Sequence, residues 1–133
     1  MNILSGIISN IQQSGSIMLV DIDVNGYQFS SMLIESIANT DWLKKENGID
    51  LIFKETEVSL AKDLQGKISM RNRLPCIVKH IERGVLLSNV TLQFQNSFIV
   101  SAITTRSVDA LQISIGDSIE ALIKANEISL MKK

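Results

Sequence analysis

An internal repeat with a period of 70 residues constrains this chain more than any other feature of its sequence. Residues 2–11 align with residues 72–81, and residues 49–60 align with residues 119–130 without a gap. Between these segments the match is weaker, although Val20 falls on Val90 and Ser31 on Ser101. Chance similarity between apolar segments would not keep one offset at both ends, so the chain is interpreted as two copies of a single module.

Each copy is expected to form short strands, because β-branched residues alternate with Gly, Asn and Ser turns. The expected strands cover residues 3–11, 16–24, 27–34 and 49–60 in the first copy and residues 73–81, 86–94, 98–105 and 118–130 in the second. Asn25-Gly26 is typical of a tight hairpin turn, and Gln95-Asn96 stands at the matching place.

A short helical segment is expected near the middle of each copy, at residues 34–44 and 106–112, where Ser107 is a candidate N-cap. Four or five strands with one helical turn predict an all-β chain made of a tandem pair of OB-like β-barrel modules. We expect the modules at residues 1–62 and 68–133, joined by a linker at residues 63–67.

The composition predicts a globular cytoplasmic protein, since 45% of the residues are hydrophobic and 20% are charged. The longest apolar runs, at residues 17–20 and 99–103, are far shorter than the roughly 20 residues of a membrane-spanning helix. The first residues lack the basic and apolar regions of a signal peptide. Cys76 is the single cysteine, and we expect it to be a buried small hydrophobe.

Charge is divided unevenly between the halves. Residues 1–67 carry five Lys and nine acidic residues, a balance of −4, whereas residues 68–133 carry four Arg, four Lys and five acidic residues, a balance of +3. An anion would therefore be attracted first to the second half. A solvated basic face without a ligand would give the same pattern, so both interpretations stay open.

The sequence carries few groups suited to catalysis. His80 is the only histidine, it lies in an apolar strand pattern, and it aligns with Asn10, which favours an ordinary strand residue over a catalytic base. The phosphate-binding sequence G-x-x-x-x-G-K-[ST] and a His/Cys metal cluster do not occur in the sequence. We therefore expect a binding protein rather than an enzyme, with no metal site and no cofactor.

Single-stranded nucleic acid is a weaker alternative ligand. OB barrels that bind single strands use aromatic side chains interleaved with cations. Aromatic residues make up only 5% of this chain, and Tyr27 and Trp42 lie in the acidic copy. We expect no binding of nucleic acid.

A small anion held by backbone N–H groups and a few cations fits the residues better. Two segments are candidates, one rich in side-chain donors and one in which small residues follow a cation; they are Ser69-Met70-Arg71-Asn72-Arg73 and Lys124-Ala125-Asn126. Arg presents planar, fixed donors and Lys a mobile point charge, and the two together suit a tetrahedral dianion.

At these residues the sequence resembles the molybdate-binding Mop family, whose modules are also called TOBE domains. The resemblance consists of four ordered motifs: S-x-R-N-x-L at residues 69–74, I-E-x-G at 81–84, A-I-T-x-x-S-x-x-x-L at 102–111 and G-x-x-x-x-A-x-I-K-A at 116–125. It covers nearly all of residues 68–131. The first half resembles the family only through its repeat of the second.

The resemblance implies an OB-like barrel that binds molybdate or tungstate between modules or subunits. It implies oxyanion-binding roles for Ser69, Met70, Arg71, Asn72, Lys124, Ala125 and Asn126, and secondary roles for Thr104 and Ser107. It further implies a homo-oligomer, with a trimer preferred over a dimer. A molybdate transporter or regulator is a possible partner.

The first copy departs from these motifs. It begins at Met1, without a Ser and an Arg ahead of Asn2, and Glu55 follows Lys54 where the second copy has Ala125. A carboxylate beside a dianion weakens binding, by about 1 kcal/mol or more at close range. The main site is therefore expected in the second copy, with the first copy as a structural partner.

Three functions follow, in order of preference. The first is intracellular binding of molybdate or tungstate for storage, buffering or homeostasis. The second is an oxyanion-sensing accessory or interaction module of a molybdate transporter or regulator. The third is a nucleic-acid-binding OB module.

Overall fold

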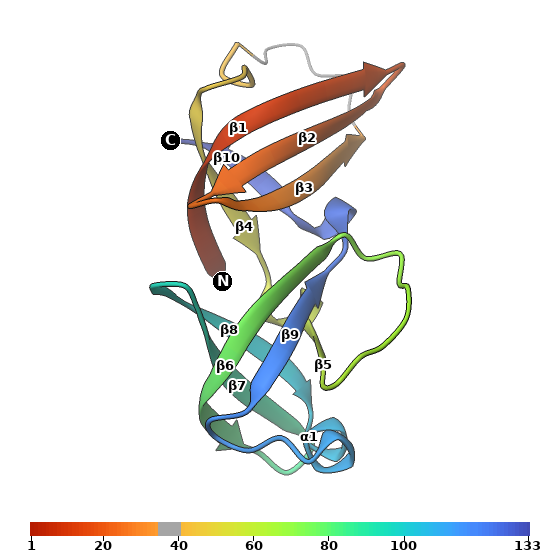
Figure 1. Ribbon diagram of the computed structural model, residues 1–133, viewed down its shortest axis with the longest axis vertical. Coiled ribbons are helices and arrows are strands. Elements are labelled where there is room, and N and C mark those ends of the chain that lie inside the picture. Colours follow the sequence, from red (N-terminus) through yellow and green to blue (C-terminus); the bar gives the residue numbers. More distant parts are fainter. Residues whose placement is uncertain (35–40) are drawn as a thin grey trace.

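The computed structural model describes residues 1–34 and 41–133, and most of this chain forms β-strands (Figure 1). The first half contains β1 (Asn2–Ser14), β2 (Ile17–Val24), β3 (Tyr27–Ile34), β4 (Gly48–Phe53), the 3-10 turn η1 (Glu55–Glu57) and β5 (Ser59–Ala61). The second half contains β6 (Asn72–Arg83), β7 (Leu87–Phe94), β8 (Ser97–Thr104), α1 (Thr105–Leu111), β9 (Ser118–Ile123), the 3-10 turn η2 (Ala125–Glu127) and β10 (Ser129–Lys132).

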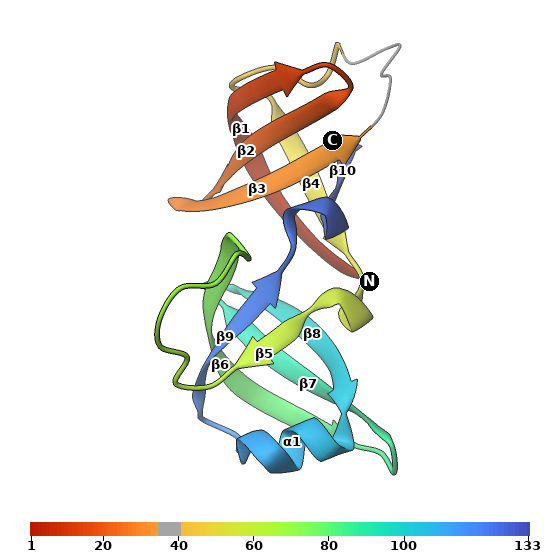
Figure 2. The ribbon, with the colours of Figure 1, turned by 90° about the vertical axis from the view of Figure 1, so that its right-hand side faces the viewer.

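The strands form two antiparallel sheets of five strands each. Their strand orders are β10-β4-β1-β2-β3 and β5-β9-β6-β7-β8. Both sheets are strongly curled, and they lie one above the other along the long axis of the molecule (Figures 1 and 2). The predicted all-β fold with two OB-like barrels is confirmed.

The prediction of single long strands at residues 49–60 and 118–130 is wrong, because a 3-10 turn interrupts each segment. Lys54 and Lys124 keep an extended backbone and lead into η1 and η2. After each turn the chain enters the opposite sheet: β5 pairs with β9, and β10 pairs with β4. The last strand of each half therefore completes the sheet of the other half. A 3-10 turn needs neither Gly nor Pro, so no residue marked the interruption.

The two halves share one hydrophobic core, because buried side chains of both barrels belong to a single cluster. Aromatic side chains cross the boundary between them. Phe94 of β7 contacts Tyr27 and Phe29 of β3 edge to face, with ring centroids 5.5 and 5.8 Å apart. Such edge-to-face pairs add to the free energy gained from burial alone.

The hairpin turn predicted at Asn25-Gly26 is confirmed. Asn25 has a φ of 50° and Gly26 a φ of 87°, the positive values that a tight turn between twisted strands requires. The matching turn after β7 lies against it, because the Gln95 side-chain amide donates to the carbonyl of Val24 at 3.2 Å. The two hairpins thus meet where the barrels join.

α1 follows β8 directly, close to the helical segment expected at residues 106–112. Thr104 is its N-cap, since its hydroxyl accepts a hydrogen bond from the Ser107 N–H at 3.1 Å. Ser107 was therefore wrong as the cap, because it lies in the first turn of the helix. The helical segment expected at residues 34–44 lies mostly outside the described residues. Among the described helices, none has the length and apolar character needed to span a bilayer.

Two buried asparagines join the halves. The Asn72 side chain pairs with the backbone of Ser30 in β3, accepting from its N–H at 2.8 Å and donating to its carbonyl at 3.0 Å. Its counterpart Asn2 pairs in the same way with Val100 in β8, through two bonds of 2.9 Å. Each asparagine thus supplies a side-chain amide where a backbone partner is missing.

Two buried serines repeat this symmetry after the 3-10 turns. The Ser31 hydroxyl donates to the carbonyl of Ile128, and the Ser101 hydroxyl donates to the carbonyl of Val58, both at 2.6 Å. Ser31 and Ser101 are 70 positions apart, and so are their partners Val58 and Ile128, which matches the period of the repeat. The serines therefore fix both exchanged segments to the barrel that each one enters.

We expect Asn72→Ala to lower the free energy of unfolding by about 2–4 kcal/mol, because the change leaves buried backbone groups of Ser30 without partners. Chemical denaturation measures this loss. Asn89→Ala is the matched control, since Asn89 is exposed on β7, and it is expected to have an effect of less than about 0.5 kcal/mol. Equal losses for the two variants would contradict the role assigned to Asn72.

Candidate functional site

Pairing of β6 with β9 brings the two anion-binding segments together. Asn72 is the partner of Ile123 in this ladder, so Arg71 and Lys124 lie at adjoining strand ends. Lys124 leads directly into η2, which carries Ala125 and Asn126. The junction lies at the waist of the molecule, where β6 begins and β9 ends (Figure 1).

The side chains of these segments differ in their exposure to solvent. The exposed side chains are those of Ser69, Arg71, Lys124 and Asn126. The half-buried ones are Met70 and Ala125. In the part of the chain that the structure describes, neither Arg71 nor Lys124 forms a salt bridge. The junction therefore presents two free positive charges on adjoining strands.

Two other cations are paired instead. Arg73 forms a salt bridge of 2.7 Å with Glu120, and its guanidinium lowers the pKa of that carboxyl. Lys62 lies 3.0 Å from Asp117, whose pKa is lowered by a hydrogen bond from the Ser114 backbone and then by Lys62. Arg73 and Lys62 are thus neutralised, whereas Arg71 and Lys124 keep their charge free to attract an anion.

Asn72 is fully engaged within the protein. Besides its two bonds to Ser30, its amide donates to the carbonyl of Ile123 at 3.0 Å. Both amide hydrogens are then used, so donation to an anion would require breaking one of these bonds. The geometry fits Asn72 as the residue that fixes β6 against β9 and against β3 of the other half.

The first half contributes two residues that the sequence analysis did not assign to the site. Ser30 holds Asn72 through its backbone, and Ser31 holds the end of η2 through the carbonyl of Ile128. The alignment of Ser31 with Ser101 was the one available signal. That alignment could not reveal the contact of Ser31 with Ile128, because the acceptor is a backbone carbonyl in a segment 97 residues away.

The counterpart of the junction in the first half has a different charge. Lys54 leads into η1 as Lys124 leads into η2, but Glu55 occupies the place of Ala125. The Glu55 carboxylate accepts a hydrogen bond from the amino group of Met1, which lowers the pKa of Glu55. The residue after Lys54 is thus a carboxylate paired with the chain's amino group, where the second half has a small apolar residue.

Thr104 and Ser107 lie far from the junction, at the opposite end of the second barrel (Figure 2). Their hydroxyl groups are 2.7 Å apart at the start of α1. Thr104 also lines a cavity of about 560 Å³ together with Arg83 and Arg106. The structure therefore does not bring these two residues together with Arg71 and Lys124.

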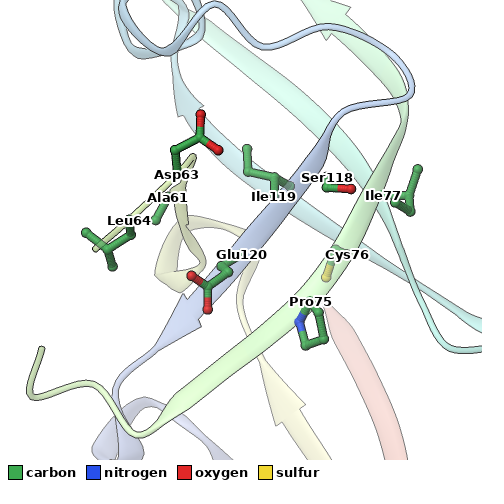
Figure 3. A pocket seen from close by; sticks show the side chains of 9 residues that line it. All are labelled: Ala61, Asp63, Leu64, Pro75, Cys76, Ile77, Ser118, Ile119 and Glu120. Carbon is green, nitrogen blue, oxygen red and sulfur yellow. The ribbon is translucent and has the colours of Figure 1, made fainter. Parts of the chain in front are cut away.

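A cavity of about 360 Å³ lies along β6 and β9, lined by Ala61, Asp63, Leu64, Pro75, Cys76, Ile77, Ser118, Ile119 and Glu120 (Figure 3). Its charged groups are the carboxylates of Asp63 and Glu120, which disfavour an anion. Burial raises the pKa of the Cys76 thiol to about 12, so the group is a neutral thiol at physiological pH. This cavity does not have the charge expected of an oxyanion site.

Similarity to known proteins agrees with the motifs. A family model described as the TOBE domain matches residues 68–130. A molybdate-binding protein from Sporomusa ovata is 37% identical, and the match covers 50% of this chain and 100% of that chain with a TM-score of 0.50. The chain belongs to the TOBE-domain family.

Two further relatives extend this TOBE similarity over both halves. A structure of the cytoplasmic molybdate-binding protein ModG, with molybdate bound, is 28% identical and matches with a TM-score of 0.94, covering 99% of this chain and 96% of that chain. The molybdenum import ATP-binding protein ModC of Brucella abortus is 32% identical over 92% of this chain. The chain spans about a third of the length of this curated relative, 32%.

Proposed function

We propose that this TOBE-domain protein binds molybdate, and tungstate with it, for storage, buffering or homeostasis of the oxyanion in the cytoplasm. The observation that carries the proposal is the match to ModG, which extends over both barrels and includes the exchanged strands. The two unpaired cations at the waist supply the charge that such a ligand needs. Binding of this kind requires no catalytic group, and we propose no enzymatic activity.

The proposed site has distinct roles for its residues. Arg71 and Lys124 supply the positive charge, and Ser69 supplies a hydroxyl donor. Further donors are the backbone N–H groups of Met70, Ala125 and Asn126; no side chain caps the turn that contains the last two. Asn72 holds the two segments in register rather than donating to the ligand.

A role as the oxyanion-sensing module of a transporter or regulator is the alternative. The similarity to ModC supports it only in part, because this chain matches 32% of that protein's length. A shared ligand explains the similarity without a shared partner. Storage or buffering is therefore the preferred function.

Calorimetric titration of the purified protein with molybdate, tungstate and sulfate tests the proposed function. We expect molybdate and tungstate to bind much more tightly than sulfate, because the site is proposed to fit the larger dianions. The absence of both binding heat and a thermal shift with molybdate and tungstate would refute the proposal.

We expect Lys124→Ala to weaken molybdate binding by roughly ten- to a hundredfold, because a lost hydrogen bond to a charged ligand costs about 1.5–3 kcal/mol. Lys54→Ala is the matched control at the equivalent position, where Glu55 replaces Ala125 and Met1 stands in the place of Arg71, and its effect is expected to be much smaller. Dissociation constants from the same titrations measure both. A large loss with Lys54→Ala and none with Lys124→Ala would place the site in the first half.

We further expect the protein to self-associate, with a trimer preferred over a dimer. Arg71 and Lys124 are exposed, and a second copy would shield a bound dianion from solvent. The halves also carry opposite net charges, −4 and +3. Light scattering with molybdate present measures the mass, and a strictly monomeric species would contradict this expectation.

A further inference from the structure

A five-residue segment carries several of the proposed oxyanion donors from one barrel to the other. Residues 124–128, the bridge segment, leave β9 of one sheet and lead into β10 of the other. In the η2 turn of this segment, the Glu127 N–H donates to the Lys124 carbonyl at 3.0 Å. The Ile128 N–H donates to the Ala125 carbonyl at 3.5 Å, which is long for a backbone hydrogen bond. The turn therefore holds its own end only weakly.

Both ends of the bridge segment are held by consecutive residues of β3 in the first half. At its start, the Asn72 side chain donates to the carbonyl of Ile123 and is itself paired with the backbone of Ser30. At its end, the hydroxyl of Ser31 donates to the carbonyl of Ile128 at 2.6 Å. The η2 turn also packs against β3 (Figure 2). The first half thus supports a segment that is proposed to bind the anion in the second.

The Ser31 contact acts on the end of the turn, close to the proposed backbone donors. These donors are the N–H groups of Ala125 and Asn126, which open the turn, and the first N–H groups of a helical turn have no partner within it. Ile128 directly follows the turn, so a bond to its carbonyl restrains the whole turn. Ser31 is fully buried, and bulk water cannot take over the bond of its hydroxyl.

The first half contains the same support at a turn where the main site is not proposed. The Ser101 hydroxyl of β8 donates to the carbonyl of Val58 at 2.6 Å, and Val58 follows η1 as Ile128 follows η2. Ser31 and Ser101 are both 0% exposed. The two serines therefore hold equivalent turns with equivalent bonds. Comparing them separates a role in folding, which both share, from a role in binding.

We propose that Ser31 of the first half is a positioning residue for the oxyanion site of the second half. This inference rests on the proposed function. Ser31 acts through η2 rather than on the ligand, because its hydroxyl holds the end of the turn and so keeps the N–H groups of Ala125 and Asn126 in fixed directions. Preorganised donors bind an anion more tightly than donors that the anion must first order. The site consequently depends on both halves of the chain.

Calorimetric titration of Ser31→Ala and Ser101→Ala with molybdate tests this role. We expect Ser31→Ala to weaken binding roughly five- to thirtyfold, because the anion must then order backbone that the hydroxyl no longer holds. Ser101→Ala is the matched control, and its affinity should stay within about twofold of the wild-type value, since distant sites without shared partners act independently. Both variants should lower the melting temperature by similar amounts, because each leaves one buried carbonyl without its partner.

Equal effects of the two variants on molybdate affinity, or no effect of either, would overturn the role of Ser31. If Ser31→Ala does not fold, Ser31→Cys replaces it, because this variant keeps the shape of the side chain and substitutes a weak thiol donor for the hydroxyl. Ser31→Cys should then bind molybdate less tightly than the wild-type protein. In that case an unchanged affinity would contradict the proposal.

A ligand-free measurement separates failure of this role from failure of the proposed function. Amide proton and nitrogen-15 chemical shifts report on the geometry of the turn. In Ser31→Ala the signals of Ala125 and Asn126 should move or broaden, whereas in Ser101→Ala they should match those of the wild-type protein. If they stay in place in Ser31→Ala, the positioning role is refuted whether or not molybdate binds. If they move but the wild-type protein binds neither molybdate nor tungstate, the proposed function is wrong and the inference fails with it.

Discussion

The exchange of β5 and β10 between the sheets is the constraint on which the rest of the structure depends. Neither sheet has its fifth strand without a segment from the other half. The crossing segments bring polar backbone into the interior, where an unpaired group costs free energy. Asn2, Asn72, Ser31 and Ser101 supply the missing partners, and their bonds offset that cost. The exchange and the buried polar contacts therefore require each other.

This constraint also determines where charge can remain free. Within the barrels, cations are used to neutralise carboxylates, as Arg73 does for Glu120 and Lys62 for Asp117. At the junction of β6 and β9, Asn72 fixes the end of β6 with neutral hydrogen bonds in place of an ion pair. Arg71 and Lys124 can consequently stay unpaired beside a backbone held by hydrogen bonds. Such preorganisation lowers the cost of binding an anion.

The sequence predicted the features that local patterns determine. The repeat, most of the strands, the OB-like barrels and the turn at Asn25-Gly26 follow from periodicity and turn chemistry. The strand exchange does not, because residues 54–57 and 124–127 contain no Gly or Pro and continue an apparent strand. The motifs also identified the segments at Arg71 and Lys124 that the structure brings together. The contact of Asn72 with Ser30 depends on tertiary packing, which leaves no signal in either segment alone.

The two copies differ where a ligand would bind and agree where the halves touch. Glu55 replaces Ala125 at the junction, a change that alters charge on the surface and leaves the turn intact. Asn2 and Asn72 cannot change at so small a cost, because each pairs with backbone groups of the other half. Replacing either one by an apolar residue would leave those backbone groups without a hydrogen-bond partner. The symmetry of the fold therefore preserves both asparagines, while the neighbouring anion positions are free to diverge.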